Sequence, residues 1–193
     1  MGTKVVIVGR GPGIIGGKLG GWIDESEIVV RMSHGRYNKD YGFKIDYLLV
    51  TGDEITTLRK LDLLKLKGLW FYRTQGKGPI TTDAEWIKYD NIIKESSNYT
   101  GEVIHINSII EPWLALYKEI ARPLNLKNHP HVTYPSKGTA GALMAIETFK
   151  PKRLYLLGMD NVVMGERTYH CHDFSAENKV IKKAAEEYSV ETI

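Results

Sequence analysis

Short apolar runs that alternate with longer segments of helical spacing constrain this chain more than any other feature. The runs are rich in Val, Ile, Leu or Tyr and most are bounded by turn residues, which is typical of buried strands. Strands are expected at 4–9, 27–32, 46–51, 69–73, 102–107 and 153–158. Helices are expected at 54–67, 83–95, 112–121, 139–149 and 175–188. The alternation predicts an α/β, Rossmann-like fold, with a mostly parallel sheet and helices on both faces.

Length and charge limit the other possibilities. A chain of 193 residues without repeats or a linker is expected to form a single domain over 1–193, with a frayed tail at 189–193. A net charge of +3 does not by itself indicate nucleic acid, and it is compatible with an anionic ligand such as a nucleotide. The sequence leaves the oligomeric state open.

The compartment is expected to be cytoplasmic. Cys171 is the single cysteine, so no disulfide can form within the chain, and this favours a reducing compartment. The apolar run at 4–9 is too short for a signal peptide. No stretch approaches the roughly 20 apolar residues of a membrane-spanning helix, so no integral membrane segment is expected.

A glycine-rich loop follows the first expected strand. In parallel α/β sheets, ligands bind at the carboxyl ends of the strands. Glycines there let the backbone approach a ligand, exposed N–H groups can hold an anion, and an arginine can contact phosphate. A plain tight turn explains the same residues. The loop comprises Gly9, Arg10, Gly11, Pro12 and Gly13, which match neither the dinucleotide nor the Walker pattern.

Small and hydroxyl residues precede the alanine-rich helix expected at 139–149. They can hydrogen-bond a ribose, base or phosphate, or Ser136 or Thr139 can simply cap the helix. The segment comprises Ser136, Gly138 and Thr139, together with Lys137.

The richest candidate loop lies between the last expected strand and the last helix. A neutral histidine is well suited to accept a proton near pH 7, so His172 is the candidate general base. Glu177 follows five residues later and can either orient the imidazole or cap the helix. The alternation of His170, Cys171 and His172 lacks the usual spacing of zinc ligands, so no metal site is expected. A structural role for both histidines also stays open.

In their order along the chain, these motifs resemble the animal and bacterial sialyltransferases. The matching elements are the glycine loop at 9–13, Arg-Met-Ser at 31–33, the helix start at 136–141, Gly-Met-Asp at 158–160, and His172 followed by Glu177. Arg10 and Ser33 stand where the family has asparagine. The resemblance implies the sialyltransferase variant of the glycosyltransferase A fold.

The resemblance also implies an activity and a set of roles. The activity is inverting sugar transfer from a nucleotide-sugar, most simply CMP-linked, to a hydroxyl of a glycan or another acceptor, without a metal ion or a bound cofactor. The catalytic residues are then His172 as base, with Glu177, His170 and Tyr169. The donor-binding residues are then Gly9, Arg10, Gly11, Pro12, Gly13, Arg31, Ser33, Ser136, Lys137, Gly138, Thr139, Asp160 and Arg167.

Three other functions stay open at this point. A basic, unanchored transferase can act on a modified base in DNA, as some phage enzymes do. The archaeal-type pterin pyrophosphokinases, which need ATP and magnesium, have a similar glycine-rich start and a Gly-x-Asp strand end. A nucleotide-binding module without catalysis would bind without turnover.

Overall fold

The computed structural model describes residues 3–9, 11–32, 38–51, 66–72, 91, 99, 101, 103–121, 125–126, 129–130, 134–159 and 172–193. In this part of the chain, seven strands form one sheet in the order β5-β4-β3-β2-β1-β8-β9, and every neighbouring pair is parallel. The strands are β1 (Lys4–Val8), β2 (Ile28–Met32), β3 (Tyr47–Val50), β4 (Gly68–Phe71), β5 (Val103–His105), β8 (Arg153–Leu157) and β9 (Glu191–Thr192). Two short antiparallel strands, β6 (Asn125–Leu126) and β7 (His129–Pro130), form a separate pair.

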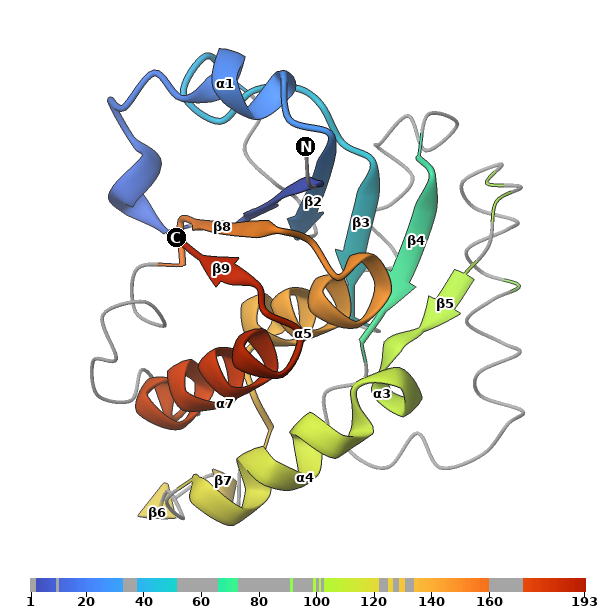
Figure 1. Ribbon diagram of the computed structural model, residues 1–193, viewed down its shortest axis with the longest axis vertical. Helices are drawn as coiled ribbons and strands as arrows, with labels where there is room; N and C mark the ends of the chain where they lie inside the picture. Colours follow the sequence, from blue (N-terminus) through green and yellow to red (C-terminus); the bar gives the residue numbers. More distant parts are fainter. Residues whose placement is uncertain are drawn as a thin grey trace.

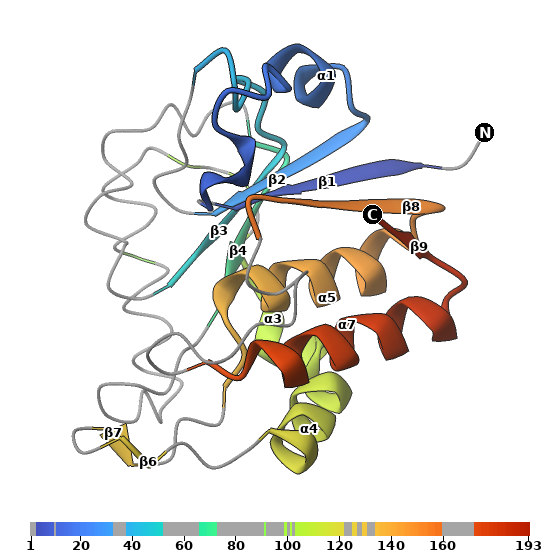
Figure 2. The same cartoon turned by 90° about the vertical axis from the view of Figure 1, so that its left-hand side faces the viewer.

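Helices cover both faces of the sheet, as predicted. Figure 2 shows α1 (Gly20–Asp24) on one side and α3 (Ile106–Ile109), α4 (Glu111–Ile120), α5 (Lys137–Phe149) and α7 (Phe174–Glu187) on the other. The short 3₁₀ helix η1 (Pro12–Ile14) follows β1. Figure 1 shows α5 lying across the centre of the sheet, with α7 and α4 packed outside it. The α/β, Rossmann-like prediction is therefore confirmed.

The largest apolar core lies between the sheet and helices α4, α5 and α7. Helix α5 is buried from Gly138 to Ile146, because its small residues allow it to lie close against the strands. A side chain at Gly141, for example, would start only 3.0 Å from Cδ2 of Leu49 on β3. Helix α7 is amphipathic and buries only one stripe, which includes Val180 and Ala184.

Most expected strands and helices match those observed, with shifts of one or two residues at their ends. The last residues of the expected strand 102–107 instead begin α3 at Ile106. The expected helices 54–67 and 83–95 lie almost wholly outside the described residues.

The expectation of a frayed tail at 189–193 is wrong. The backbone N–H of Ile193 donates to Leu154 at 2.9 Å, and the N–H of Leu156 donates back to Ile193 at 2.9 Å. These bonds make β9 a further parallel strand beside β8, and Arg153 forms an ion pair with Glu191 at 2.9 Å. The 189–193 segment is ordered by pairing with β8, which is distant in sequence, so the local sequence gave little indication of a strand there.

Strands β1 and β8 end in a close backbone contact between Gly9 and Gly158. The N–H of Gly9 donates to Leu157 at 2.7 Å, and the N–H of Gly11 donates to Gly158 at 2.8 Å. A Cβ on Gly9 would lie 2.3 Å from the carbonyl oxygen of Gly158, which leaves no room for a side chain. Gly158 itself has a φ of +65°, which favours glycine. Packing of the sheet therefore already requires glycine at position 9.

We expect Gly9→Ala to lower the free energy of unfolding by about 2 kcal/mol, the scale for overpacking a tight site. The matched control is Gly21→Ala, because a Cβ at Gly21 in α1 meets nothing within 4 Å. That change should raise the free energy of unfolding by about 0.5 kcal/mol, because alanine favours a helix over glycine. Urea unfolding measures the free energy of unfolding of both variants. Equal midpoints for the two variants would contradict the close contact between Gly9 and Gly158.

Candidate active site

A fully buried carboxylate, Glu177, lies where the first turns of α5 and α7 meet. Its Oε1 accepts a hydrogen bond from the backbone N–H of Ser136 at 2.7 Å. Its Oε2 accepts from Oγ of Ser136 at 2.6 Å and from Oγ1 of Thr139 at 2.5 Å. The Glu177 side chain is 0 % exposed, so these donors replace water around the carboxylate.

His172 lies beside this carboxylate, just before the start of α7. Its Nδ1 is 3.5 Å from Oε1 of Glu177 and is buried, whereas the side chain as a whole is 26 % exposed. The exposed surface therefore belongs to other atoms of the side chain. The imidazole of His172 thus faces a buried carboxylate with one ring nitrogen, while other atoms of the side chain are accessible to solvent. This arrangement suits a general base whose tautomer is set by a neighbouring acid.

Burial raises the pKa of Glu177 from its ordinary value of 4.5 to about 7, because the charged form loses its hydration. The hydrogen bonds from Ser136 and Thr139 act in the opposite direction, since they stabilise the carboxylate, and the nearby Asp173 adds a small further rise. The positive ends of α5 and α7 also favour the charged form. Glu177 can therefore exchange a proton near neutral pH.

The structure separates the alternatives that the sequence left open around these helix starts. Ser136 is the N-cap of α5 and accepts a hydrogen bond from the backbone N–H of Thr139, but it also donates to Glu177. Glu177 does not cap α7, because Asp173 holds that position and accepts from the N–H of Ala176 at 3.0 Å. Glu177 instead lies next to the imidazole, in the place where it can orient the ring.

The glycine loop and the start of α5 come together through Met159, which follows β8. A Cβ on Gly9 would lie 3.1 Å from Cγ of Met159, and a Cβ on Gly138 would lie 2.9 Å from its Cε. The start of α5, and with it Glu177, therefore lies at the carboxyl ends of β1 and β8. This is the edge at which a parallel sheet binds its ligands.

Arg31, one of the expected donor-binding residues, is buried and donates hydrogen bonds to backbone carbonyls. Its side chain is 0 % exposed, its Nε donates to the carbonyl of Lys44 at 2.7 Å, and its Nη2 donates to the carbonyl of Tyr41 at 2.8 Å. The guanidinium thus holds the segment after β2 against the sheet. Donor binding by Arg31 stays a prediction.

Several expected site residues cannot be placed. Arg10, Ser33, Asp160, Arg167, Tyr169 and His170 lie outside the described residues, as does Cys171. Only the backbone of Pro12 is described. The ligand contacts expected of Gly11, Gly13 and Lys137 stay predictions.

Two buried tyrosines for which the sequence predicts no role contact the segments that precede α5 and α7. Oη of Tyr72, directly after β4, donates to the carbonyl of Pro135 at 3.0 Å. Oη of Tyr117, on α4, accepts from the backbone N–H of Asp173 at 3.3 Å. An aromatic residue in an apolar run or on a helix normally indicates packing, so only the structure shows that their hydroxyls reach the site.

Among the described residues, no group of three or more His, Cys, Asp or Glu side chains is arranged to hold a metal ion. The described helices are all too short or too polar to cross a lipid bilayer.

Comparison with known proteins gives matches in structure but not in sequence. No protein-family model matches the chain, and neither does any curated protein sequence. A mammalian sialyltransferase in complex with Gal-β-1-3GalNAc-ortho-nitrophenol superposes with a TM-score of 0.60 at 17 % identity, over 99 % of this chain and 69 % of the other. A second mammalian sialyltransferase structure gives 0.61 at 16 % identity, over 99 % and 68 %.

A bacterial-type match extends this result. The sialyltransferase CST-II, as a tyrosine-to-phenylalanine variant in complex with CMP, superposes with a TM-score of 0.60 at 12 % identity, over 98 % of this chain and 80 % of the other. The predicted resemblance is therefore confirmed at the level of fold, and the chain has a sialyltransferase-like fold.

The raised pKa of Glu177 predicts a characteristic dependence of stability on pH. Between about 4.5 and about 7 the folded protein binds more protons at Glu177 than the unfolded chain does. The free energy of unfolding therefore falls as pH rises through this window. Relative to Glu177→Gln, the wild type should lose about 3 kcal/mol across it, at about 1.4 kcal/mol per pKa unit.

Urea unfolding of both proteins from pH 4.5 to 8 measures this difference. Glu186→Gln, on the exposed side of the same helix, is the matched control and should run parallel to the wild type. A wild-type curve that runs parallel to that of Glu177→Gln would contradict the burial of an ionisable carboxyl.

Proposed function

We propose that this protein is an inverting, metal-independent glycosyltransferase that moves a sugar from a CMP-linked donor to a hydroxyl of a glycan acceptor, with His172 as general base. The observation that carries the proposal is the pairing of His172 with the buried Glu177, 3.5 Å apart, in a sialyltransferase-like fold. The pair lies at the carboxyl ends of β1 and β8, next to the glycine loop.

The reaction follows from this pairing. The neutral imidazole of His172 takes the proton of the acceptor hydroxyl through Nε2, while Nδ1 faces Glu177. The acceptor oxygen then forms a bond to the anomeric carbon as the bond from that carbon to the phosphate oxygen breaks. The phosphate leaves with the bonding electrons as CMP. A single displacement of this kind inverts the anomeric centre.

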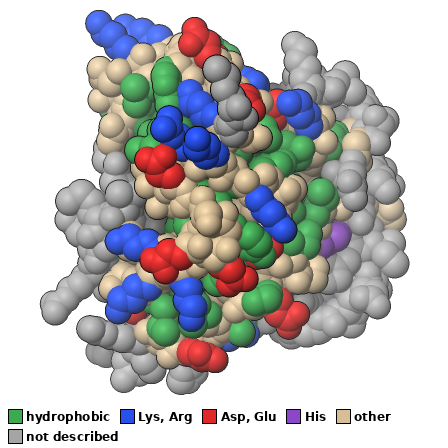
Figure 3. All heavy atoms as spheres, viewed as in Figure 1, with side chains coloured by type: hydrophobic (Ala, Val, Ile, Leu, Met, Phe, Trp, Pro, Cys, Tyr) green, Lys and Arg blue, Asp and Glu red, His purple; other side chains and the backbone are tan. Residues whose placement is uncertain are grey.

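The compared structures support the choice of substrates. One sialyltransferase is in complex with CMP, and another is in complex with a Gal-β-1-3GalNAc derivative. A CMP-linked sugar and a glycan are therefore the first donor and acceptor to test. Figure 3 gives no support to DNA as the acceptor on the face it shows, because the Lys and Arg side chains of the described residues are interspersed with Asp and Glu.

The role of the base has a direct test. His172→Ala should lower kcat by at least about a hundredfold, the low end for removal of a general base, while the affinity for CMP stays unchanged. Release of CMP from CMP-sugar donors measures turnover, and calorimetry measures nucleotide binding. Ser175→Ala, at an exposed position in the first turn of α7, is the matched control and should keep full activity. Turnover of His172→Ala within a few-fold of the wild type would remove His172 from the mechanism.

Metal independence separates this function from that of a pyrophosphokinase. A CMP leaving group carries less charge than a diphosphate, so donors from Arg167, Tyr169 and His170 can suffice in place of an ion. We expect full activity in excess EDTA, and a large loss in Tyr169→Phe or His170→Ala that magnesium does not restore. Activity that disappears with the chelator and returns with magnesium would contradict the proposal and favour the pyrophosphokinase.

A further inference from the structure

Helix α4 reaches the segment that carries His172, although the two are far apart in sequence. Tyr117 on α4 is 1 % exposed, and its ring lies in the main apolar core. Its Oη accepts the backbone N–H of Asp173, the residue directly after His172, at 3.3 Å. The peptide that joins the candidate base to α7 is therefore anchored to a different helix.

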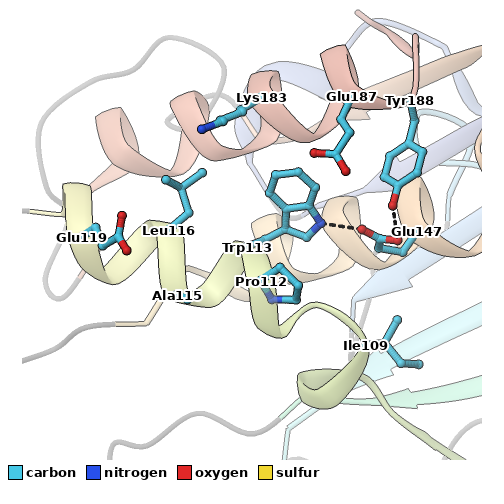
Figure 4. Close-up of a pocket in the computed structure, with 10 residues that line it drawn as sticks. All are labelled: Ile109, Pro112, Trp113, Ala115, Leu116, Glu119, Glu147, Lys183, Glu187 and Tyr188. Atoms are coloured by element: carbon cyan, nitrogen blue, oxygen red, sulfur yellow. Dashed lines mark hydrogen bonds between the residues drawn. The ribbon is translucent and has the colours of Figure 1, made fainter.

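Helix α4, which carries Tyr117, is itself held by a hydrogen bond to a neighbouring helix. Glu147 on α5 accepts hydrogen bonds from Nε1 of Trp113 on α4 at 2.6 Å and from Oη of Tyr188, just after α7, at 2.9 Å. Figure 4 shows these side chains converging on Glu147 between the three helices. The Trp113 bond ties α4 to α5 one turn away from Tyr117, whereas the Tyr188 bond ties the end of α7 to α5 and does not involve α4.

The segment that precedes α5 is also held by a tyrosine hydroxyl, in this case from the end of β4. Oη of Tyr72 donates at 3.0 Å to the carbonyl of Pro135, and the next residue, Ser136, makes two of the hydrogen bonds to Glu177. Tyr72 is fully buried, and its pKa is raised well above its ordinary value by that burial and by the nearby Glu177. The phenol therefore keeps its proton and remains a donor.

We propose that Tyr117 and Tyr72 are positioning residues for the base: Tyr117 fixes the His172 segment, Tyr72 fixes the Ser136 segment, and together they set the separation of His172 from Glu177. This inference rests on the proposed function of His172. The two contacts come from different elements, one from α4 and one from the residue directly after β4. A backbone shift at either segment changes how the imidazole meets Glu177, although neither phenol touches the reacting atoms.

The test uses Tyr117→Phe and Tyr72→Phe, which keep the buried ring and remove only the hydroxyl. Each should lower kcat about tenfold with KM unchanged within twofold, because small misplacements of a catalytic group are costly. Tyr188→Phe is the matched control: it also removes one phenol hydrogen bond in the helical layer, but one to Glu147. It should leave kcat unchanged.

A double-mutant cycle distinguishes positioning from general destabilisation. In a His172→Ala background, Tyr117→Phe should have no further effect on the residual kcat, because the group that it positions is absent. An additive tenfold loss in that background, or an equal loss in Tyr188→Phe, would overturn the proposal.

A second measurement does not depend on turnover. In ¹⁵N-histidine NMR spectra, Tyr117→Phe and Tyr72→Phe should each shift the imidazole signals of His172, assigned by their loss in His172→Ala, whereas Tyr188→Phe should not. Unchanged His172 signals in both variants would overturn the positioning role. If the signals shift while the wild type shows no transferase activity, the proposed function fails and the positioning of this histidine stands.

Discussion

The candidate site depends on the burial of one carboxylate between two helices. Glu177 takes three hydrogen bonds from the start of α5 while lying in the first turn of α7, so it links the two helices through their N-terminal ends. The positive ends of both helices stabilise the charge that burial opposes. Since Ser136 also caps α5, the same contacts hold the helix and fix the neighbour of His172. The stability of the helix start and the geometry of the proposed catalytic pair therefore rest on shared residues.

A second close contact determines where this carboxylate lies relative to the sheet. Gly9 and Gly158 bring the ends of β1 and β8 together, and Met159 then fills the space between the glycine loop and Gly138 at the start of α5. The close contact between Gly9 and Gly158 therefore places two elements next to each other. One is the loop expected to bind the donor, and the other is the start of α5, which donates hydrogen bonds to Glu177. Gly9, which the sequence suggested for ligand binding, is required for this packing whether or not a ligand binds. The packing role and a ligand-binding role are compatible.

The sequence was sufficient for six of the seven strands of the described sheet, because buried parallel strands are continuous apolar runs, a pattern that needs no knowledge of neighbours. It also brought His172 and Glu177 together, because five residues at a helix start keep both at one end of the helix. It could not show that Ser136 and Thr139 face Glu177 across about forty residues of chain, or that Tyr117 supports Asp173. Such contacts, and the pairing of β9, depend on tertiary packing alone.

In the proposed mechanism, the hydrogen bonds around Glu177 determine which proton arrangement allows His172 to act as a base. Ser136 donates to both carboxylate oxygens and Thr139 donates to Oε2, while Nδ1 of His172 faces Oε1. An ionised Glu177 favours a proton on Nδ1, which leaves the lone pair of Nε2 free to take a proton from an acceptor. A protonated Glu177 would donate to Nδ1 and place the imidazole proton on Nε2, where it blocks that step. Burial raises the pKa of Glu177 and the donors of α5 counteract that rise, with a net value of about 7, so in the proposed mechanism these donors favour the competent arrangement near neutral pH.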